Sequence, residues 1–465
     1  MKRKIKILYV TAEIAPYANA GGLGEVGRSF PRALQETGRY EVQRVMPLYK
    51  RIDKKLEYVT DMKVRMDLGY ETCVIKKDPD SKELPTYFVQ SDRYFYRDNI
   101  YAYEDDGFRF FLFCKAVVEM LKAIPFQPDI VHMNDWHTGF LALLLKQEFP
   151  KIKTVYTIHN ISYHGFIPAS YLNGLLTEEE LVWLGYPEWL NFMKAGIKYA
   201  DLITTVSLGY AMEILQPVNS CGMNNLLVEK ADHFVGILNG IDMESYDPSR
   251  SGDLEYPYDQ RSTELKKKNR TLLRTQYGLP DEDKPLLAMV TRLDYAKGLD
   301  ILMKAISYLE LSTFQLIILG SGNPYYQGML GCIKTAYADK VVADFDYSAD
   351  KARKIYAAAD IYLMPSLYEP CGLSQLYAMR YGAVPVVNPI GGLRDTVIDE
   401  STTANSTGFY MEDWSGEALS RAIKRAIDAY HTPGWKQYMM NGMKQDFSWQ
   451  HSISEYDRYY QKILL

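Results

Sequence analysis

The stretch IKILYVTAEIAPYANAGGLG, residues 5–24, joins a short apolar run to a glycine-rich loop. Ile5–Val10 has the length and composition of a buried strand, and we expect a helix from about Leu23, disturbed near Pro31. Glycines in such a loop let backbone N–H groups approach a phosphate at the start of the helix. The loop does not match the G-x-G-x-x-G dinucleotide fingerprint, and a glycine pair at this place is often only a tight turn.

The strand–helix rhythm of this stretch continues through most of the chain. Helical spacing of apolar residues predicts helices through residues 110–121 and 141–145. The alternation predicts parallel sheets with helices on both faces and ligands at the carboxyl ends of the strands. Further strands are predicted at Asp129–Met133, Lys153–Ile158, Leu202–Val206, Leu286–Val290, Gln315–Leu319, Lys340–Ala343, Ile361–Met364 and Val384–Val387.

A polar stretch divides the chain. Residues 247–285 are rich in Asp, Glu, Lys, Arg, Pro and Gly, which favours a crossing between domains. The 465 residues are also too many for one compact domain. We therefore expect an α/β protein with two Rossmann-like domains facing a cleft, residues 1–245 and 246–445.

Composition excludes several classes of protein. The net charge of -5 argues against nucleic acid as the main partner. The apolar run Ile7–Val10 is shorter than the ~7–15 residues of a secretory leader, and no run reaches the roughly 18–20 residues of a membrane span. The five cysteines form no CxxC pair. We expect a cytoplasmic protein without membrane contact, disulfide framework or zinc site.

Two groups of residues at predicted strand ends carry candidate chemistry. Arg292 and Lys297 follow the strand Leu286–Val290, where two cations can neutralise the charge that grows on a departing diphosphate. Taken alone, the pattern slightly favours two solvated charges on a loop. Glu369 follows the strand Ile361–Met364, beside a helix start where Gly372 and Leu373 offer backbone donors; a glutamate there is often only a cap.

Histidines and acidic pairs are weaker candidates. His132, His137 and His159 lie at or just after predicted strands, although such residues are more often part of the core or a loop. Three Asp-x-Asp sequences, Asp78–Asp80, Asp281–Asp283 and Asp344–Asp346, have the form of a metal site in many glycosyltransferases. Only the third adjoins a strand, and Arg292 with Lys297 can do the same work without a metal.

Taken together, these stretches resemble the bacterial glycogen synthase and plant starch synthase family. The resemblance runs nearly end to end, and its strength lies in the number, order and spacing of modest motifs. They are Gly21–Leu23, His132–Gly139, Thr157–Asn160, Ala200–Ser207, Gly236–Asp242, Arg292 with Lys297–Asp300, Glu369–Tyr377, Gly391–Thr396 and Phe447–Trp449.

The family implies a GT-B fold and metal-independent, retaining transfer of glucose from ADP-glucose, or in some relatives UDP-glucose, to an α-glucan. It implies that the helix 446–465 crosses back onto the N-terminal domain. His159, Asp135 and Glu369 are then expected at the sugar, and Arg292 and Lys297 at the diphosphate. The expected donor site also includes Asn19, Gly21, Gly22, Asn239, Tyr347, which stacks on the base, and Cys371, Gly372, Leu373 and Ser374.

One position departs from the family pattern. The first loop usually reads Lys-x-Gly-Gly-Leu, but Asn19 stands at the lysine position, and Glu25 replaces a frequent Asp. A cation expected at the donor phosphates is therefore missing. This leaves three hypotheses: an active α-1,4-glucan synthase using ADP-glucose, a relative using UDP-glucose or a short maltooligosaccharide, and a weakly active or non-catalytic glucan-binding protein.

Overall fold

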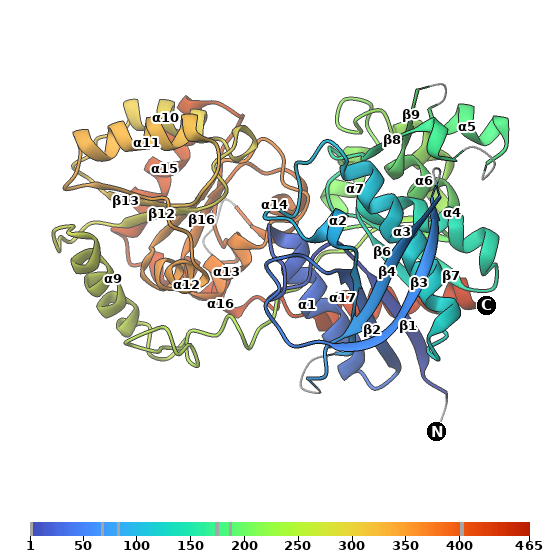
Figure 1. Cartoon of the computed structure of the whole chain (residues 1–465). Helices are drawn as coiled ribbons and strands as arrows, with labels where there is room; N and C mark the ends of the chain where they lie inside the picture. Colours follow the sequence, from blue (N-terminus) through green and yellow to red (C-terminus); the bar gives the residue numbers. More distant parts are fainter. Residues whose placement is uncertain (1–2, 67–68, 81–83, 173–175, 186–187, 400–403) are drawn as a thin grey trace. The chain divides into compact units, whose positions relative to one another are not determined.

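The computed structural model describes residues 3–66, 69–80, 84–172, 176–185, 188–399 and 404–465 (Figure 1). The chain forms two compact units. Unit 1 is Met1–Gly240 with Trp449–Leu465, and unit 2 is Ile241–Ser448. Each unit is an α/β structure built on its own sheet. No helix of the described residues has the length and apolarity needed to cross a membrane.

Unit 1 contains a nine-stranded sheet in the order β11-β10-β7-β6-β1-β2-β5-β4-β3. Seven strands are parallel: β1 (Ile5–Val10), β2 (Tyr40–Pro47), β5 (Thr86–Gln90), β6 (Ile130–Asn134), β7 (Lys153–Ile158), β10 (Leu202–Thr205) and β11 (Phe234–Gly236). The main helices are α1 (Gly22–Glu36), α3 (Asp106–Ala123), α4 (Gly139–Glu148), α6 (Phe192–Tyr199), α7 (Leu208–Ile214) and α8 (Asn224–Glu229). Shorter elements include α2 (Asp92–Phe95), α5 (Glu178–Leu184) and the strand pair β8 (Phe166–Pro168) and β9 (Trp189–Asn191).

The edge of this sheet corrects the expectation of purely parallel pairing. β3 (Glu57–Met66) pairs antiparallel with β4 (Gly69–Lys77), and β4 pairs antiparallel with β5. Most side chains of β3 are exposed or half-buried. Antiparallel strands can leave one face in water, whereas parallel strands are normally covered on both faces. The continuous apolar runs that identified the other strands are therefore missing here.

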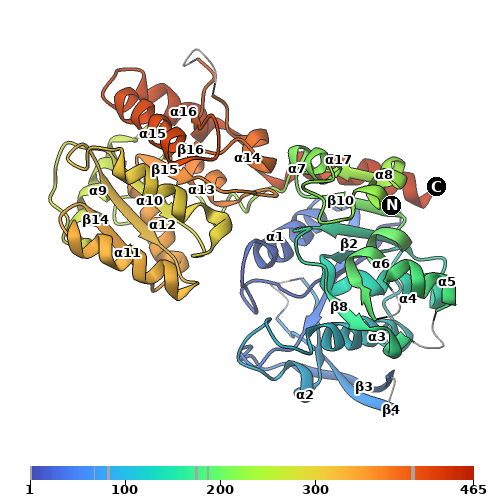
Figure 2. The same cartoon turned by 90° about the horizontal axis from the view of Figure 1, so that it is seen from above.

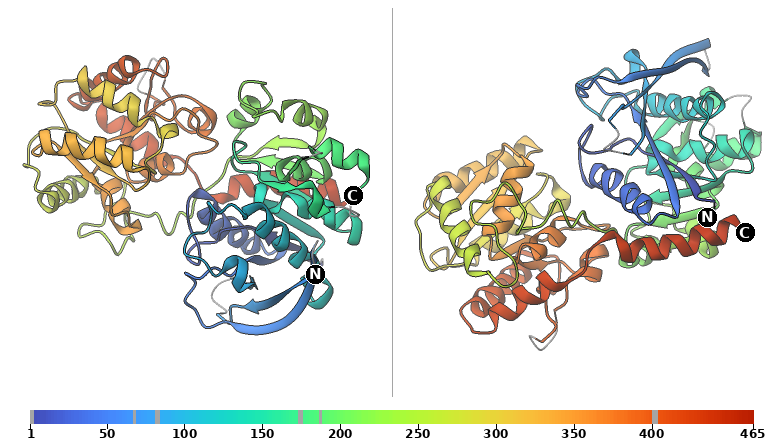
Figure 3. Two further views of the ribbon diagram at one scale, coloured as in Figure 1. Left: turned by 45° about the horizontal axis from the view of Figure 1, so that its top comes forward. Right: turned by 90° about the horizontal axis from the view of Figure 1, so that it is seen from below.

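The last helix, α17 (Trp449–Leu464), belongs to unit 1 and packs on α1 (Figure 3). The indole nitrogen of Trp449 donates to the Ser29 hydroxyl at 2.8 Å. The Tyr460 hydroxyl lies 2.7 Å from Nδ1 of His132 in β6. The chain thus leaves unit 1, forms unit 2, and returns to complete the first core.

Unit 2 contains a six-stranded parallel sheet in the order β14-β13-β12-β15-β16-β17. Its strands are β12 (Leu286–Val290), β13 (Gln315–Leu319), β14 (Val341–Asp344), β15 (Ile361–Met364), β16 (Val384–Val387) and β17 (Phe409–Tyr410). One apolar core involves α10 (Leu299–Ser307), α11 (Pro324–Ala336) and α15 (Gly416–Tyr430) (Figure 2). A second involves α9 (Glu264–Tyr277), α12 (Ala349–Ala358), α13 (Ser374–Arg380) and α16 (Trp435–Lys444). The helix α14 (Gly391–Thr396) follows β16.

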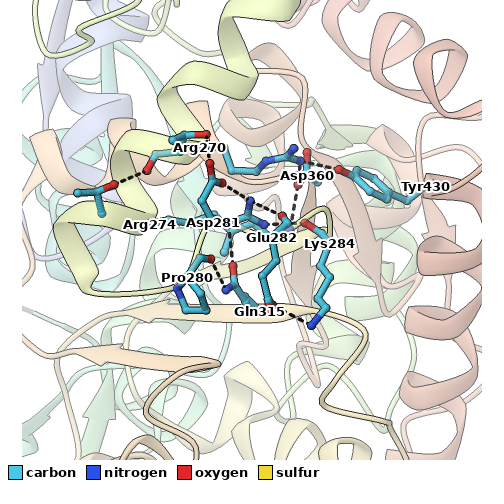
Figure 4. Close-up of polar contacts among 12 residues, drawn as sticks. Arg270, Arg274, Pro280, Asp281, Glu282, Lys284, Gln315, Asp360 and Tyr430 are labelled. Carbon is cyan, nitrogen blue, oxygen red and sulfur yellow. Dashed lines mark hydrogen bonds and ion pairs between the residues drawn. The ribbon is translucent and has the colours of Figure 1, made fainter.

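The helix α9 corrects the interpretation of residues 247–285 as a plain polar crossing. Its buried positions are mostly polar or charged, and they recur at helical spacing: Lys266, Asn269, Arg270, Leu273 and Arg274. Arg270 donates to Asp360 at 2.6 Å, and Arg274 donates to Gln315 at 2.7 Å (Figure 4). Because hydrogen bonds replace apolar contacts on this face, hydrophobic periodicity did not reveal the helix.

Both sheets reverse their strand order beside the first strand of the unit. In unit 1 the chain builds outward from β1 to β2 and then restarts on the other side with β6. In unit 2 the same reversal separates β12 from β15. Ligands of open α/β sheets bind at the carboxyl ends of the strands beside such a reversal. The loops after β1 and β6, and after β12 and β15, are therefore the places to search for a site.

Candidate active site

Lys297 and Glu369 meet beside the strand reversal of unit 2. Lys297 follows β12 and Glu369 follows β15, and Nζ of Lys297 lies 2.7 Å from Oε2 of Glu369. The hydroxyl of Ser366 donates to the same carboxylate oxygen at 3.0 Å. Both members of the ion pair are largely buried. A buried, hydrogen-bonded charge pair holds both side chains in place more firmly than a solvated pair does.

Gly298 explains how Lys297 comes so close to the loop after β15. Its φ of 73° lies in the left-handed region, and a Cβ here would approach the Pro365 carbonyl oxygen to 2.0 Å. Only glycine allows this backbone approach without strain. The turn therefore fixes Lys297 at the start of α10.

Arg292, the other predicted cation, is more open. Its side chain is 58% exposed, and it forms a long ion pair with Asp294 at 3.7 Å. A weak, exposed ion pair of this kind is worth little, because water competes for both partners. Arg292 is therefore available to an anionic ligand, whereas Lys297 already has a partner.

The segment before α13 offers unpaired backbone donors. No described residue accepts a hydrogen bond from the backbone N–H of Gly372 or Leu373. Gly372 has a φ of 70°, and a Cβ would lie 2.4 Å from the Gln375 side chain. Cys371 is buried, and the Ser374 hydroxyl contacts the Met364 sulfur at 3.3 Å. The N–H groups of Gly372 and Leu373 are thus free to donate hydrogen bonds to an anion.

Tyr347 lies after β14, and its ring is 55% exposed. An exposed aromatic ring at the carboxyl edge of the sheet is suited to stacking. The neighbouring Asp344 and Asp346 are both bound by Lys351, each at 3.0 Å. One ammonium group therefore bridges the two carboxylates of this Asp-x-Asp sequence. Among the described residues no three His, Cys, Asp or Glu side chains gather as a metal site.

In unit 1 the loop after β1 is tied down by Glu13. Its Oε2 accepts from the backbone N–H of Ala20 at 2.5 Å, and its Oε1 accepts from the Tyr101 hydroxyl at 2.6 Å. The Asn19 amide donates to Glu25 at 2.9 Å. The exposed Gly21 and Gly22 begin α1. Asn19 therefore supplies no charge, and its Nδ2 group already donates one hydrogen bond to Glu25.

His159 follows β7 and is fixed by Asn134 of β6. Its Nε2 lies 3.0 Å from Asn134 Oδ1, and the Asn134 amide donates to the Val10 carbonyl at 3.0 Å. Since Oδ1 can only accept, Nε2 carries the proton and Nδ1 is left as an acceptor. Burial lowers the pKa of His159 to about 3, so the ring is neutral at physiological pH.

Asp135 has an unusual backbone and an unusual charge state. Its φ is 61°, a backbone conformation that residues other than glycine rarely adopt. Strained conformations of this kind are often found at functional sites. Burial raises the pKa of its carboxyl to about 8, against opposing hydrogen bonds from the backbone of Trp136 and Asn160. Asp135 is therefore mainly protonated near neutral pH.

The other candidate residues of unit 1, His132, His137 and Asn239, are packed or hydrogen-bonded within the protein. His132 is enclosed between Tyr460 and Thr157, at 2.7 and 2.6 Å, and His137 stacks on Tyr101 with ring centroids 4.8 Å apart. Asn239 is buried in the loop after β11, and its backbone N–H donates to the Val206 carbonyl. His132 is thus a core residue rather than a site residue.

Sequence reasoning did not identify Glu13, Tyr101 or Asn134 as site residues. Tyr101 is separated from Glu13 by 88 positions, so no local motif connects them. The only local signal for Glu13 is a carboxylate just after the first strand, in an otherwise apolar stretch. A carboxylate at that position has to be satisfied by some partner.

Comparison with known proteins shows which family the chain is related to. Residues 6–229 match the family described as starch synthase catalytic domain, and residues 272–436 match the glycosyl transferases group 1. The glycogen synthase of Moorella thermoacetica is 42% identical, over 100% of this chain and 98% of that protein. The chain belongs to the glycogen and starch synthase family.

Other comparisons agree with this membership. The glycogen synthase of Desulforudis audaxviator is 38% identical, over 98% of this chain and 96% of its own length. The catalytic domain of starch synthase IV from Arabidopsis thaliana, solved with ADP and acarbose, has a TM-score of 0.92 at 30% identity. That match covers 99% of this chain and 100% of the plant domain. The chain is therefore a glycosyltransferase with the two-domain α/β fold of this family.

Proposed function

We propose that the protein extends an α-glucan by transferring glucose from ADP-glucose to the non-reducing end, with retention at the anomeric carbon. The pairing of Lys297 with Glu369 beside the unpaired N–H groups of Gly372 and Leu373 carries the proposal. This arrangement puts a cation and two dipoles where a diphosphate would depart, next to a carboxylate that would face the sugar.

The proposed step breaks one bond and forms one bond. The bond between the anomeric carbon and the diphosphate oxygen breaks, and its electron pair leaves with ADP. The 4-hydroxyl oxygen of the terminal glucan residue bonds to the anomeric carbon, and its proton passes to a phosphate oxygen. Attack on the face from which ADP departs gives retention without a covalent sugar–enzyme intermediate.

Asp135 supports a mechanism without a protein nucleophile. Burial raises the pKa of Asp135 to about 8, so its carboxyl is mostly neutral at pH 7. A protonated carboxyl is a poor nucleophile. Asp135 and the neutral His159 are instead proposed to form hydrogen bonds with sugar hydroxyls, Asp135 as a donor and Nδ1 of His159 as an acceptor.

We propose that transfer needs no bound metal. Arg292 and Lys297 would supply the positive charge that a divalent ion supplies in other transferases. The Asp344–Asp346 alternative is disfavoured because Lys351 already forms an ion pair with each carboxylate. All five cysteines are free, which suits the reducing cytoplasm that we expect as the location.

A second candidate concerns the donor and the rate. Asn19 is hydrogen-bonded to Glu25 where relatives are expected to place a lysine, so this enzyme would hold the donor phosphates with one cation fewer. UDP-glucose as donor, a short maltooligosaccharide as acceptor, or weak activity would each be compatible with that loss. The exposed Tyr347 ring is proposed to stack on either base.

The test is incorporation of radiolabelled glucose into glycogen, with ADP-glucose and UDP-glucose in parallel and with EDTA in a matched set. We expect polymer-bound label from ADP-glucose that EDTA does not reduce, and α-1,4 linkages in the product. Preference for UDP-glucose would establish the alternative donor. Incorporation that requires added Mg²⁺ would favour a metal site at Asp344–Asp346. No incorporation from either donor would favour the non-catalytic hypothesis.

A further inference from the structure

A pocket of about 360 Å³ lies in unit 1 at the amino-terminal ends of β7 and β10. Strand β7 ends in front of His159, so the pocket and the sugar-site candidates lie at opposite ends of one strand. Strands rise ~3.3 Å per residue, which puts the two ends roughly 20 Å apart. The pocket is therefore separate from the site described above.

Positive charge dominates the walls of this pocket. Its lining contains five lysines from five segments: Lys146, Lys153, Lys198, Lys230 and Lys462. The acidic side chains in the lining are those of Asp201 and Asp232, and Leu465, the last residue, adds its backbone carboxylate to the same lining. Asp201 already accepts from the backbone N–H and hydroxyl of Thr154, at 2.8 and 2.9 Å.

The five ammonium groups have no close carboxylate partner. None forms an ion pair within 4.0 Å of a carboxylate in the part of the chain that the structure describes. Lys198 lies over the Trp183 ring at 4.0 Å. A hydrogen bond from the Thr177 backbone lowers the pKa of the Glu180 carboxyl, and the charge of Lys198 also contributes to lowering it. Lysines gathered in a concave site repel one another and focus a positive potential, which a bound anion would relieve.

We propose that this pocket binds the phosphate group of a small phosphorylated metabolite. Lysine is a common phosphate ligand because its ammonium acts as a point charge with three donors. The volume is within the range of small-molecule sites, about 300–1,000 Å³, and exceeds the needs of a lone phosphate. Tyr199 and Tyr459 in the lining provide apolar surface for the organic part.

The concave shape decides against an extended polyanion. Lys153, Lys198 and Lys230 are half-buried, whereas a surface that binds a nucleic acid presents exposed lysines along a stripe. The net charge of the whole chain is -5, so the pocket stands out against an acidic protein. A ligand small enough to enter is therefore the better fit.

The experiment is lysine acetylation of the full chain, read by peptide mass spectrometry, with and without pyrophosphate. At roughly ten times the Kd, acetylation of Lys153, Lys198 and Lys230 should slow about tenfold. Lys151 is exposed, close by and outside the pocket lining, so it is the matched control and should react at an unchanged rate. Equal labelling with and without pyrophosphate overturns the proposal, as does equal protection of Lys151.

Calorimetric titration separates this pocket from the donor site. Pyrophosphate binding should persist in an Arg292→Ala/Lys297→Ala variant and weaken on the order of 10–100-fold in a Lys153→Met/Lys230→Met variant. Binding lost in the first variant and kept in the second overturns the proposal. Tighter binding of a hexose phosphate than of inorganic phosphate would support an organic ligand, and equal binding would support free phosphate as the source.

Discussion

Lys297 is the residue whose replacement tests the proposed chemistry most directly. Charge accumulates on the departing diphosphate only as the bond breaks, so Lys297→Ala should lower kcat on the order of 10²–10³-fold. Affinity for glycogen should change much less, because no charge develops on the acceptor chain. Initial rates at varied donor and glycogen concentrations separate these two effects.

Lys424 provides the control for Lys297. It is exposed on α15 and forms no ion pair with any residue that the structure describes. Lys424→Ala should leave kcat within experimental scatter. If Lys297→Ala matches the wild type in kcat, the cation has no part in the departure of the diphosphate and the assignment fails.

Asn19→Lys should raise the rate with ADP-glucose. The substitution restores a charge that an amide dipole cannot supply, and the existing Asn19 amide is already engaged with Glu25. Arg97 is a candidate to replace the missing cation by residue type, but both of its terminal nitrogens already bind Asp105 at 2.6 Å. The measurement is initial rate against donor concentration for both proteins. A lower rate in Asn19→Lys would mean that the loop is built around asparagine, and Asn19→Gln is the uncharged control.

The raised pKa of Asp135 should make the free energy of unfolding depend on pH. Its pKa is about 8 in the native state and about 3.9 in an unfolded chain, so between these values folding takes up a proton. The free energy of unfolding therefore falls as the pH rises through this window, by about 1.4 kcal/mol per pH unit. His159, with its pKa lowered to about 3, acts in the opposite direction but only below about pH 6.5.

Comparison with Asp135→Asn isolates this effect, because every other titration is shared. From pH 6.5 to 8 the stability of the wild type relative to the variant should fall by about 2 kcal/mol. Denaturant unfolding of both proteins at several pH values measures it. A difference that stays constant across this range would contradict a protonated Asp135.

Residues at strand ends could be predicted because a local pattern marks each of them. Lys297 and Glu369 each follow an apolar run, and parallel strands bring their carboxyl ends to one edge. The contact of Tyr101 with Glu13 could not be predicted, because it depends on how α3 and its preceding loop pack on the sheet. The charge state of Asp135 was equally hidden, since burial rather than residue type sets it.

At the scale of elements, α9 shows where hydrophobic periodicity stops being informative. The strands Ile5–Val10, Lys153–Ile158, Leu286–Val290 and Val384–Val387 are confirmed at both ends, because buried parallel strands are short runs rich in apolar and β-branched residues. The helix α9 buries charged residues instead, and its recognition requires the partners that they meet. The same limit explains why hydrophobic patterns did not predict β3, whose side chains are mostly exposed or half-buried.

Arg270→Ala should therefore destabilise unit 2 by about 3–5 kcal/mol, because it leaves the buried carboxylate of Asp360 without its cation. The guanidinium also accounts for a hydrogen bond to the Tyr430 hydroxyl at 2.6 Å. Lys267→Ala on the exposed side of the same helix is the control and should stay within about 0.5 kcal/mol. Calorimetry resolves the transition of unit 2, and similar losses in both variants would show that the polar face of α9 does not hold the helix.

At the scale of the whole molecule, the chain order ties unit 1 to a segment that follows unit 2. Strand–helix alternation predicts two α/β sheets, and the sheets are observed. Alternation alone cannot assign the last helix to either unit, since an amphipathic helix fits any apolar surface. The contacts of α17 make the assignment: Trp449 and Tyr456 pack on Phe30 of α1.

Truncation after Ser448 should unfold unit 1 and leave unit 2 folded. The deletion removes four large buried side chains, Trp449, Ile453, Tyr456 and Tyr460. Burial of each is worth about 1.5–3 kcal/mol, so the loss approaches the roughly 5–15 kcal/mol that stabilises a typical domain. Limited proteolysis with mass spectrometry should show rapid cleavage within residues 3–240 and a protected fragment near 241–448.

The matched point variant is Tyr460→Phe. It keeps the buried ring and removes only the hydroxyl that pairs with Nδ1 of His132, so it should cost about 1–3 kcal/mol and leave unit 1 folded. Proteolysis of the truncated chain that is no faster than that of the full chain would mean that unit 1 is stable without α17. Its packing on α1 would then be a consequence of folding and not a condition for it.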